Sequence, residues 1–291
     1  MKKPIKESRS ASEAVGKKKR AGTIVVYAIL IVWAITCIFP VYWMFTFSLK
    51  DNNEIWYDNP MGLPHNWIWS NYERALSLGN IGQYFLNSII VSVSSIAITM
   101  IAAAMATYAM TRLVWKGRRT MNKFFMLGLT IPIHASIVPL YIVLSRLNLL
   151  NTYIALIIPY SSFALSMAIL ICTGFMGDIP YDLDEAAFLD GCGVWGIFFR
   201  VIAPLLIPAV STVGIYTFLQ CWNELMFASI FNGSEKLKTL PVGIKELNSQ
   251  YSAEWGPIGA ALTIATVPTL IFYVLLSKRI QDSFIAGAVK G

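Results

Sequence analysis

The sequence predicts an all-α membrane protein with six transmembrane helices and both termini in the cytoplasm. Hydrophobic residues make up 56% of the 291 residues, against roughly 45–50% in a soluble domain. Charged residues make up 13%, about half of the usual share of roughly 25%, and the mean hydropathy is +0.59. These values exclude an ordinary soluble globular protein and a disordered chain, because most of this surface must face lipid.

Six apolar stretches are long enough to cross a bilayer, which takes about 20 helical residues. They are Thr23–Leu49, Tyr84–Met110, Phe124–Leu144, Tyr153–Phe175, Pro204–Phe231 and Pro257–Ser277. The first stretch follows a basic run, as a signal peptide does, but it is too long and lacks a cleavage site of small residues. We expect a retained helix there. Pro132 and Pro139 predict kinks in the third stretch, because proline removes a backbone donor.

The basic residues predict which side of the membrane each connecting segment faces. Most of the 23 Lys and Arg residues lie in the N-terminal tail, in the loop after the second stretch, or after the sixth. By the positive-inside rule these segments are cytoplasmic, so the net charge of +7 records topology rather than nucleic-acid binding. Contact of the tail with anionic lipid is a second interpretation. The chain divides into a basic tail (1–22), a first helix (23–49), a five-helix core (84–277) and a C-terminal tail (278–291).

The sequence contains no catalytic or energy-coupling motif. It lacks a phosphate-binding loop, zinc-protease and hydrolase motifs and a C-x-x-C pair, and therefore predicts neither an enzyme nor a bound cofactor or metal. Glu224 is the only acidic residue within the six stretches, and His134 is the only histidine there. His134 is a functional candidate, or it satisfies carbonyls that the nearby prolines leave free. If the chain transports a solute, the sequence therefore predicts that a partner supplies the energy.

The segment from 177 to 208 differs in composition from its surroundings. It is a cytoplasmic loop by the charge rule, yet it holds five of the 16 acidic residues: Asp178, Asp182, Asp184, Glu185 and Asp190. Asp178 is a suitable N-cap and Pro180 suits a first turn, so we expect a helix with acids near its positive end. Gly191 suits a left-handed C-terminal position. A second short helix, Trp195–Val201, follows, and Pro204 begins the fifth stretch.

Two interpretations of this helix–turn–helix loop remain open. One is a capped interfacial loop, because capping and the helix dipole explain the acids. The other is a docking element for a soluble cytoplasmic protein, since Ala186 and Ala187 leave a small, flat face that another surface can approach closely.

The loop resembles that of a known family. Glu185-Ala186-Ala187, Asp190-Gly191 and the downstream Ile202 and Pro204 are similar to the EAA loop of ABC importer permeases, which are binding-protein-dependent membrane subunits with a MetI-like fold. The chain is also similar to the sugar-transporting, MalG-like branch in Pro139-Leu140-Tyr141, in 147–153, in Trp222-Asn223-Glu224 and in the C-terminal 287–291. The departures are small: Cys192 replaces a usual Ala, and Ala203 replaces a common Leu.

The resemblance implies a set of partners and coupling residues. In this family a second permease subunit completes the pathway, two ATPase subunits bind below, and an extracytoplasmic binding protein delivers sugar. By similarity, Glu185 makes a charged contact with the ATPase and Gly191 permits the turn between two coupling helices. The residues that would couple to the ATPase are Asp184, Glu185, Ala186, Ala187, Asp190, Gly191, Arg200 and Pro204. The resemblance also implies a multi-pass protein of the bacterial cytoplasmic membrane.

A substrate path needs polar groups that face inward, and the fifth stretch supplies Gln220, Asn223 and Glu224. Amides and carboxylates are common hydrogen-bonding partners of sugars. Glu224 is the strongest candidate for a residue of the substrate path, because a lone intramembrane carboxylate needs a partner or water. Its alternative role is a gate or a hydrogen bond between helices, since polar residues also hold membrane helices together.

Two alternative functions belong to other classes. An ABC permease for a peptide, amino acid or polyamine would share the EAA loop. Only the segments that are similar to the sugar-transporting branch argue against it. A secondary carrier that works without ATP conflicts with the EAA loop and with the shortage of buried charge.

Overall fold

The computed structural model describes residues 4–77, 80–250 and 254–288, and it places side chains for 23–77, 80–247 and 254–275. These residues form helices and loops, with no strand among them, which confirms the all-α prediction. The long helices are α1 Pro4–Phe47, α3 Ile81–Thr111, α6 Ile154–Met176, α10 Ile207–Trp222 and α13 Trp255–Ala288. The short helices are α2 Ser70–Ser77, α4 Arg118–Gly128, α5 Ile137–Arg146, α7 Asp182–Leu189, α8 Val194–Ile197, α9 Ala203–Leu205, α11 Met226–Phe231 and α12 Leu240–Gln250. Single turns of other helix types are η1 Glu54–Asp58, η2 Ile133–Ser136, η3 Phe198–Ile202 and η4 Glu235–Leu237.

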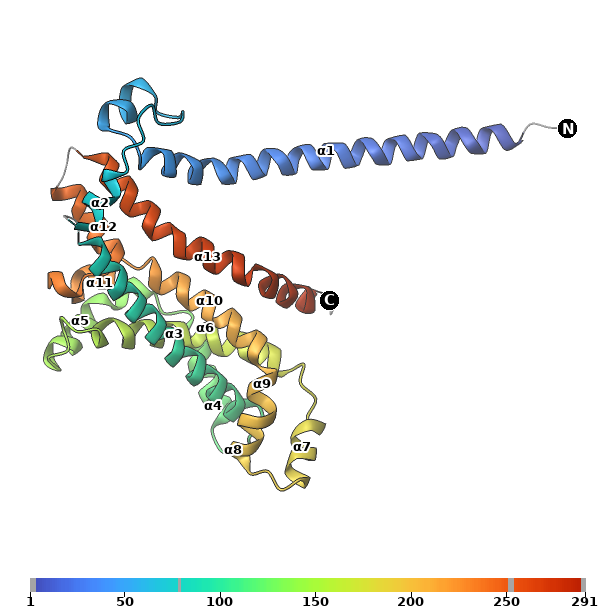
Figure 1. Cartoon of the computed structure of the whole chain (residues 1–291). Coiled ribbons are helices and arrows are strands. Elements are labelled where there is room, and N and C mark those ends of the chain that lie inside the picture. The colour runs from blue at the N-terminus through green and yellow to red at the C-terminus, as the bar shows by residue number, and fades with distance from the viewer. Residues whose placement is uncertain (1–3, 78–79, 251–253, 289–291) are drawn as a thin grey trace.

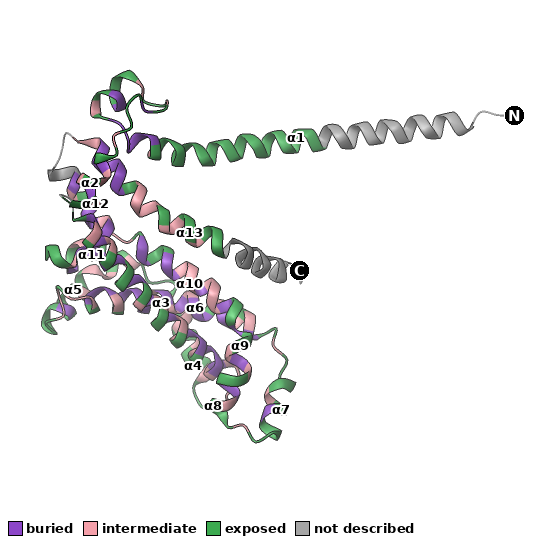
Figure 2. Cartoon of the chain, in the orientation of Figure 1, coloured by how far each residue is buried: buried purple, intermediate pink, exposed green. Residues whose placement is uncertain are grey.

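Helix α3 is the centre of the bundle and packs against α6 and α10 (Figure 1). Its inner face carries small residues such as Ser92, Ser95 and Ala103, which are fully buried and allow close approach of the neighbouring helices. Its outer face exposes Val93 and Ile101. Figure 2 shows the same division on α6 and α10, with buried residues between the helices and exposed ones outside. A bundle that is apolar both inside and outside is typical of a membrane protein.

Helix α1 lies apart from the bundle and meets it at the N-terminal end of α13 (Figure 1). The contact is close because α13 has a glycine there. A Cβ atom on Gly259 would lie 2.4 Å from Cδ1 of Phe47 and 3.0 Å from Cα of Ser48. Further along, α13 packs on α10 through stacked rings of Phe272 and Phe218, whose centroids are 4.1 Å apart. The C-terminal helix therefore joins α1 to the bundle.

Four of the described helices are long and apolar enough to cross a membrane: Thr23–Phe47 within α1, α3, α6 and Trp255–Leu275 within α13. Two further spans exist only if bent helix pairs are each counted as one. The predicted third stretch is such a pair, since α4 and the helix Ile133–Arg146 meet at 97°. Pro132 stands at this break, whereas Pro139 lies within α5 and causes no break. One of the two predicted kinks is therefore a sharp corner.

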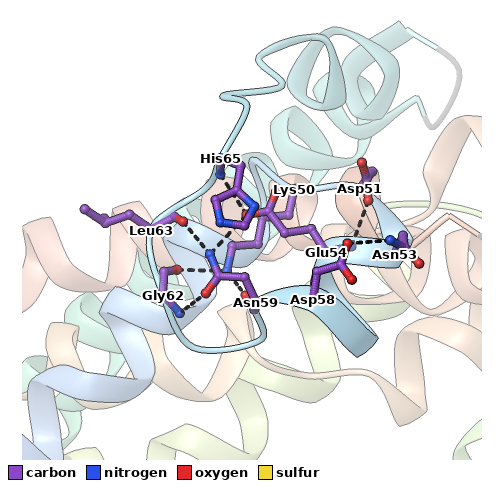
Figure 3. Close-up of polar contacts among 9 residues, drawn as sticks. All are labelled: Lys50, Asp51, Asn53, Glu54, Asp58, Asn59, Gly62, Leu63 and His65. Carbon is purple, nitrogen blue, oxygen red and sulfur yellow. Dashed lines mark hydrogen bonds and ion pairs between the residues drawn. The ribbon is translucent and has the colours of Figure 1, made fainter.

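The loop after α1 is organised around a buried lysine (Figure 3). The side chain of Lys50 is fully buried, and its Nζ donates to the carbonyl oxygens of Asn59 at 2.5 Å and Gly62 at 2.8 Å. Burial lowers the pKa of Lys50, and the charge of Glu54 partly opposes this shift. Glu54 in turn accepts hydrogen bonds from Asn59 and from the backbone N–H of His65. One ammonium group and one carboxylate thus give this polar loop a defined conformation.

Candidate functional site

Helix α7 begins later than the sequence predicted. Its first residue is Asp182, and Tyr181 rather than Asp178 occupies the N-cap position, without a hydrogen bond from its side chain to the helix. The carbonyl of Tyr181 accepts the backbone N–H groups of Asp184 and Glu185. Pro180 therefore precedes the helix, and the proposed capping role of Asp178 is wrong. The acids Asp182, Asp184 and Glu185 do lie in the first turn, where the helix dipole favours negative charge.

The C-terminal end of α7 has the turn that the sequence predicted. Gly191 has a φ of +83°, which is the left-handed region that glycine occupies without strain. The backbone N–H of Gly191 donates to Phe188 O at 3.0 Å, and that of Cys192 donates to Ala187 O at 2.9 Å. These two bonds are the pair that defines a Schellman motif. The turn after Asp190 is therefore fixed by backbone hydrogen bonds, and Gly191 is the residue that permits it.

The second helix of the loop is longer than predicted. It runs from α8 through η3 to α9, from Val194 to Leu205, and then bends by 70° into α10. Pro204 lies in the first turn of α9, so the predicted start of the fifth stretch falls inside the loop helix. Because the helix continues from Val194 into α9, Pro204 lies near its C-terminal end and lacks the N–H that would bond to the preceding turn. The corner follows Leu205, and Pro208 occupies the first turn of α10.

The exposed face of α7 is apolar with an acidic edge. Phe188 and Leu189 are 71% and 85% exposed, and Glu185 and Ala186 are exposed beside them. Ala187 is the only buried residue of α7 and packs against the core that includes Tyr108 and Ile197. Asp190, Gly191 and Arg200 are also exposed. Most of the predicted loop residues thus share an outward surface on which large apolar side chains meet water or a partner.

Asp184 points the other way. Its carboxylate lies 3.0 Å from Nη1 of Arg112, whose side chain is only 3% exposed. Arg112 follows α3 directly and was interpreted from the sequence only as a topology charge. The structure therefore separates Asp184, an internal ion-pair partner, from Glu185 on the outer surface.

At the other end of the bundle, Glu224 lies where α10 breaks before α11. Its Oε1 accepts the backbone N–H of Phe227 at 2.8 Å, and its Oε2 accepts that of Ala228 at 3.1 Å. The hydroxyl of Tyr160 on α6 also donates to Oε2. Glu224 therefore caps α11 and ties it to α6, which is the role between helices that the sequence left as the alternative. The partner Tyr160 was not predicted, because a tyrosine in an apolar stretch gives no signal of its hydroxyl contact.

An open groove with a volume of about 490 Å³ lies beside this break. Gln220 and Asn223 are exposed in it, and Gln220 Nε2 donates to the hydroxyl of Tyr216 at 2.8 Å. His134 and one edge of Glu224 line the same groove. The structure thus brings together all three residues that were predicted for the path, and it adds an aromatic ring, Tyr216, to the amides.

Comparison with known proteins assigns the chain to a family. The model of the binding-protein-dependent transport system inner membrane component matches residues 98–285, which is more than half of the chain. The chain belongs to this family. It is a membrane-integral permease subunit of an ABC importer, and the resemblance drawn from the EAA loop is confirmed. Because the family consists of transport components that depend on a binding protein, this permease is not an enzyme, and a secondary carrier is not favoured.

Several relatives cover almost the whole permease. The diacetylchitobiose uptake system permease protein NgcG of Streptomyces coelicolor is 34% identical over 281 residues, 96% of this chain and 93% of NgcG. The sulfoquinovosyl glycerol transport system permease protein SmoH of Agrobacterium fabrum is 35% identical over 254 residues, 87% and 89% of the two chains. The trehalose transport system permease protein SugB of Mycobacterium tuberculosis is 32% identical over 255 residues, which are 87% of this chain and 92% of SugB.

The fold of this permease also occurs in a solved structure. A chain in the crystal structure of a bacterial ABC transporter involved in the import of the acidic polysaccharide alginate matches with a TM-score of 0.79. The match covers 90% of this permease and 97% of that chain at 20% identity. A second crystal structure, a bacterial alginate ABC transporter in complex with an alginate pentasaccharide-bound periplasmic protein, matches with a TM-score of 0.61. These likenesses establish the MetI-like fold.

Proposed function

We propose that this permease imports a sugar or oligosaccharide that an extracytoplasmic binding protein delivers. The observation that carries the substrate class is the set of relatives above 30% identity, which are named for diacetylchitobiose, sulfoquinovosyl glycerol and trehalose transport. In this proposal the permease pairs with a second permease subunit, and the pair works with an ABC ATPase dimer in the bacterial cytoplasmic membrane. A non-sugar solute is the alternative that the substrate experiment below tests.

The loop from α7 to α9 is the proposed docking site of the ATPase. Exposed Phe188 and Leu189 would enter an apolar cleft, and Glu185 at the edge of the same face would pair with a basic group of the ATPase. Asp190 and Arg200 flank this face, and Gly191 sets the angle between its two helices. The small side chain of Ala186 lets the ATPase surface approach the α7 backbone. Ala187 and Pro204 then support the loop from within and at its corner.

The proposed topology places both termini in the cytoplasm and counts each bent helix pair as one span, which gives six. Arg112 and the basic residues of α4 lie at the end of α3 that contacts the α7 loop. The buried Lys50 loop lies at the opposite end, beside the start of α13. The positive-inside rule then puts the α7 loop in the cytoplasm and the Lys50 loop outside. In this proposal the chain keeps the four parts expected from the sequence, which are a tail (1–22), a first helix (23–49), a core (84–277) and a second tail (278–291).

The groove at the α10–α11 break is the proposed substrate path. Gln220 and Asn223 present amides to it, and Tyr216 presents a ring on which the apolar face of a sugar can lie. Glu224 contributes mainly by holding α11, since three donors already occupy its oxygens. Replacement of Asn223 by Leu should therefore reduce sugar uptake without loss of the folded permease, and uptake at the wild-type rate would contradict this path.

Docking is tested by charge reversal on α7. Glu185→Lys should abolish copurification of the ATPase and sugar uptake, while the amount of permease in the membrane stays constant. Glu73→Lys is the matched control, because Glu73 is an exposed acid on α2 at the opposite end of the bundle. Full ATPase recovery and uptake in Glu185→Lys would refute the docking role.

The substrate class is tested on the native partners. The permease is purified with its partners, and the recovered binding protein is titrated with trehalose, diacetylchitobiose, a peptide and a polyamine. Binding of a sugar supports the proposal. Binding of only the peptide or the polyamine refutes it.

A further inference from the structure

We propose that Arg112 is a positioning residue that locks α7 to the ends of α3 and α6, so that movement of α7 is transmitted to both helices. This inference rests on the proposed docking of the ATPase on α7. It goes beyond docking, because it assigns the transmission of movement to a residue that does not touch the ATPase.

The guanidinium of Arg112 joins three elements. Its Nη1 lies 3.0 Å from Oδ2 of Asp184 on α7. Its Nη2 donates to the carbonyl oxygens of Met176, the last residue of α6, at 3.1 Å and of Ile179 in the following turn. The side chain extends directly from the end of α3. The contact with Asp184 is an ion pair without hydrogen-bond geometry, whereas the two carbonyl contacts are hydrogen bonds. A planar guanidinium reaches these three groups at the same time, which the single ammonium of lysine cannot do in the same geometry.

Two tyrosines surround this contact. The ring of Tyr181, just before α7, lies 4.0 Å from the guanidinium carbon, within the range of a cation–π interaction. Its hydroxyl donates to the carbonyl of Thr111 at 3.2 Å. Tyr108 on α3 donates to the carbonyl of Val194, the first residue of α8, at 3.2 Å. Both helices of the loop are therefore held at the end of α3.

Apolar packing alone gives α7 little attachment. Ala187 is its only buried residue, and one small side chain buries little area. A buried ion pair is a poor source of stability compared with a packed apolar pair, but it fixes one geometry. The polar contacts of Arg112 are thus the connection that makes α7 follow α3 and α6 as a rigid unit, and rigid-body movement is a common mode of switching.

The test uses the complete importer in proteoliposomes, to which ATP, vanadate and the binding protein are added. Spin labels are attached at Asp182→Cys, an exposed position of α7 outside the proposed docking face, and at Ile101→Cys on the exposed face of α3. Cys37 and Cys192 are first replaced by Ser. With Arg112 present, the distance between the labels should stay narrow with and without ATP and vanadate. In Arg112→Ala and in Arg112→Lys the distribution should broaden when ATP binds. Stimulation of ATP hydrolysis by the binding protein should fall by about 5–150-fold, the range of coupling between sites.

The controls separate this inference from the docking proposal. Arg119→Ala removes an exposed positive charge from the same cytoplasmic segment and should match the wild type in both measurements. ATPase should still copurify with the Arg112 variants, whereas Glu185→Lys loses it. Should Glu185→Lys retain the ATPase, docking on α7 is wrong and this inference with it.

Two outcomes overturn the lock while leaving docking intact. One is a narrow distance distribution with normal stimulation in Arg112→Lys. The other is wild-type behaviour in Asp184→Asn. This variant keeps the side-chain shape and is measured in place of Arg112→Ala if that variant fails to assemble. Asp184→Asn should broaden the distances, and wild-type behaviour in that variant overturns the inference.

Discussion

Glu224 and Tyr160 offer a quantitative test of how the α10–α11 break is held. The carboxylate of Glu224 accepts two backbone N–H groups at the start of α11 and the hydroxyl of Tyr160 on α6. Glu224→Ala removes both carboxylate oxygens and with them all three hydrogen bonds. Tyr160→Phe removes only the hydroxyl and keeps the ring, which forms a T-shaped pair with Phe227. The two variants therefore remove overlapping sets of contacts.

The expected losses follow from the contacts. Loss of a side-chain cap costs about 0.5–2 kcal/mol, and a hydrogen bond to a charged group contributes about 1.5–3 kcal/mol. We therefore expect Glu224→Ala to lower the free energy of unfolding by about 2–5 kcal/mol and Tyr160→Phe by about 1.5–3 kcal/mol. Because both variants lose the same bond, the double variant should cost less than the sum by roughly 1–3 kcal/mol.

The assay is chemical denaturation of the purified permease in detergent micelles, followed by circular dichroism, for the wild type, both single variants and the double variant. Tyr141→Phe is the matched control, because Tyr141 is an exposed tyrosine on α5 and its replacement should change stability little. Additive losses in the double variant would refute the direct bond between Glu224 and Tyr160. An unchanged stability in Glu224→Ala would refute its capping role.

Three further predictions concern single backbone and loop features. Gly191→Ala should weaken the α7–α8 turn by about 1–2 kcal/mol, because a Cβ is strained at positive φ, whereas Gly191→Asn should be milder; equal hydrogen-exchange protection of α7 in both variants would contradict this. Lys50→Met should leave the carbonyls of Asn59 and Gly62 without their donor, and protease should cleave that loop faster than in the wild type; an unchanged cleavage rate would argue against the buried ammonium as its organiser. Gly259→Leu should force α13 away from Phe47 and lower the free energy of unfolding by about 1–3 kcal/mol. An unchanged melting curve would show that α1 and α13 do not pack as described.

The sequence predicted the helices better than their corners. The apolar stretches of α3, of α6 and of the candidate span Trp255–Leu275 within α13 were placed to within a few residues, because a long apolar run in a membrane protein has few alternatives to a helix. The stretch from Phe124 to Leu144 also reads as one run, but the chain turns by 97° within it. Pro132 signals a possible break, and Pro139 gives the same signal without one.

The functional residues divide in the same way. Glu185, Gly191 and their neighbours were identified from sequence, because a short loop carries its own capping and turn chemistry. The inward orientation of Asp184 was missed. In the sequence, Arg112 and Asp184 are separated by α4, α5 and α6. Their contact therefore depends on how the ends of α3 and α6 lie beside each other.

By itself, the sequence determined that this chain is an all-α membrane protein, which stretches are apolar enough to be helices, and that one acidic loop ends in a left-handed glycine. These properties depend on composition and on contacts between near neighbours in the chain, which are visible in the order of residues. Only the tertiary structure decided that Asp184 faces Arg112 while Glu185 faces outward, and that Glu224 binds Tyr160 on α6. Such contacts join residues from different helices, and their geometry is set by the packing of the whole bundle.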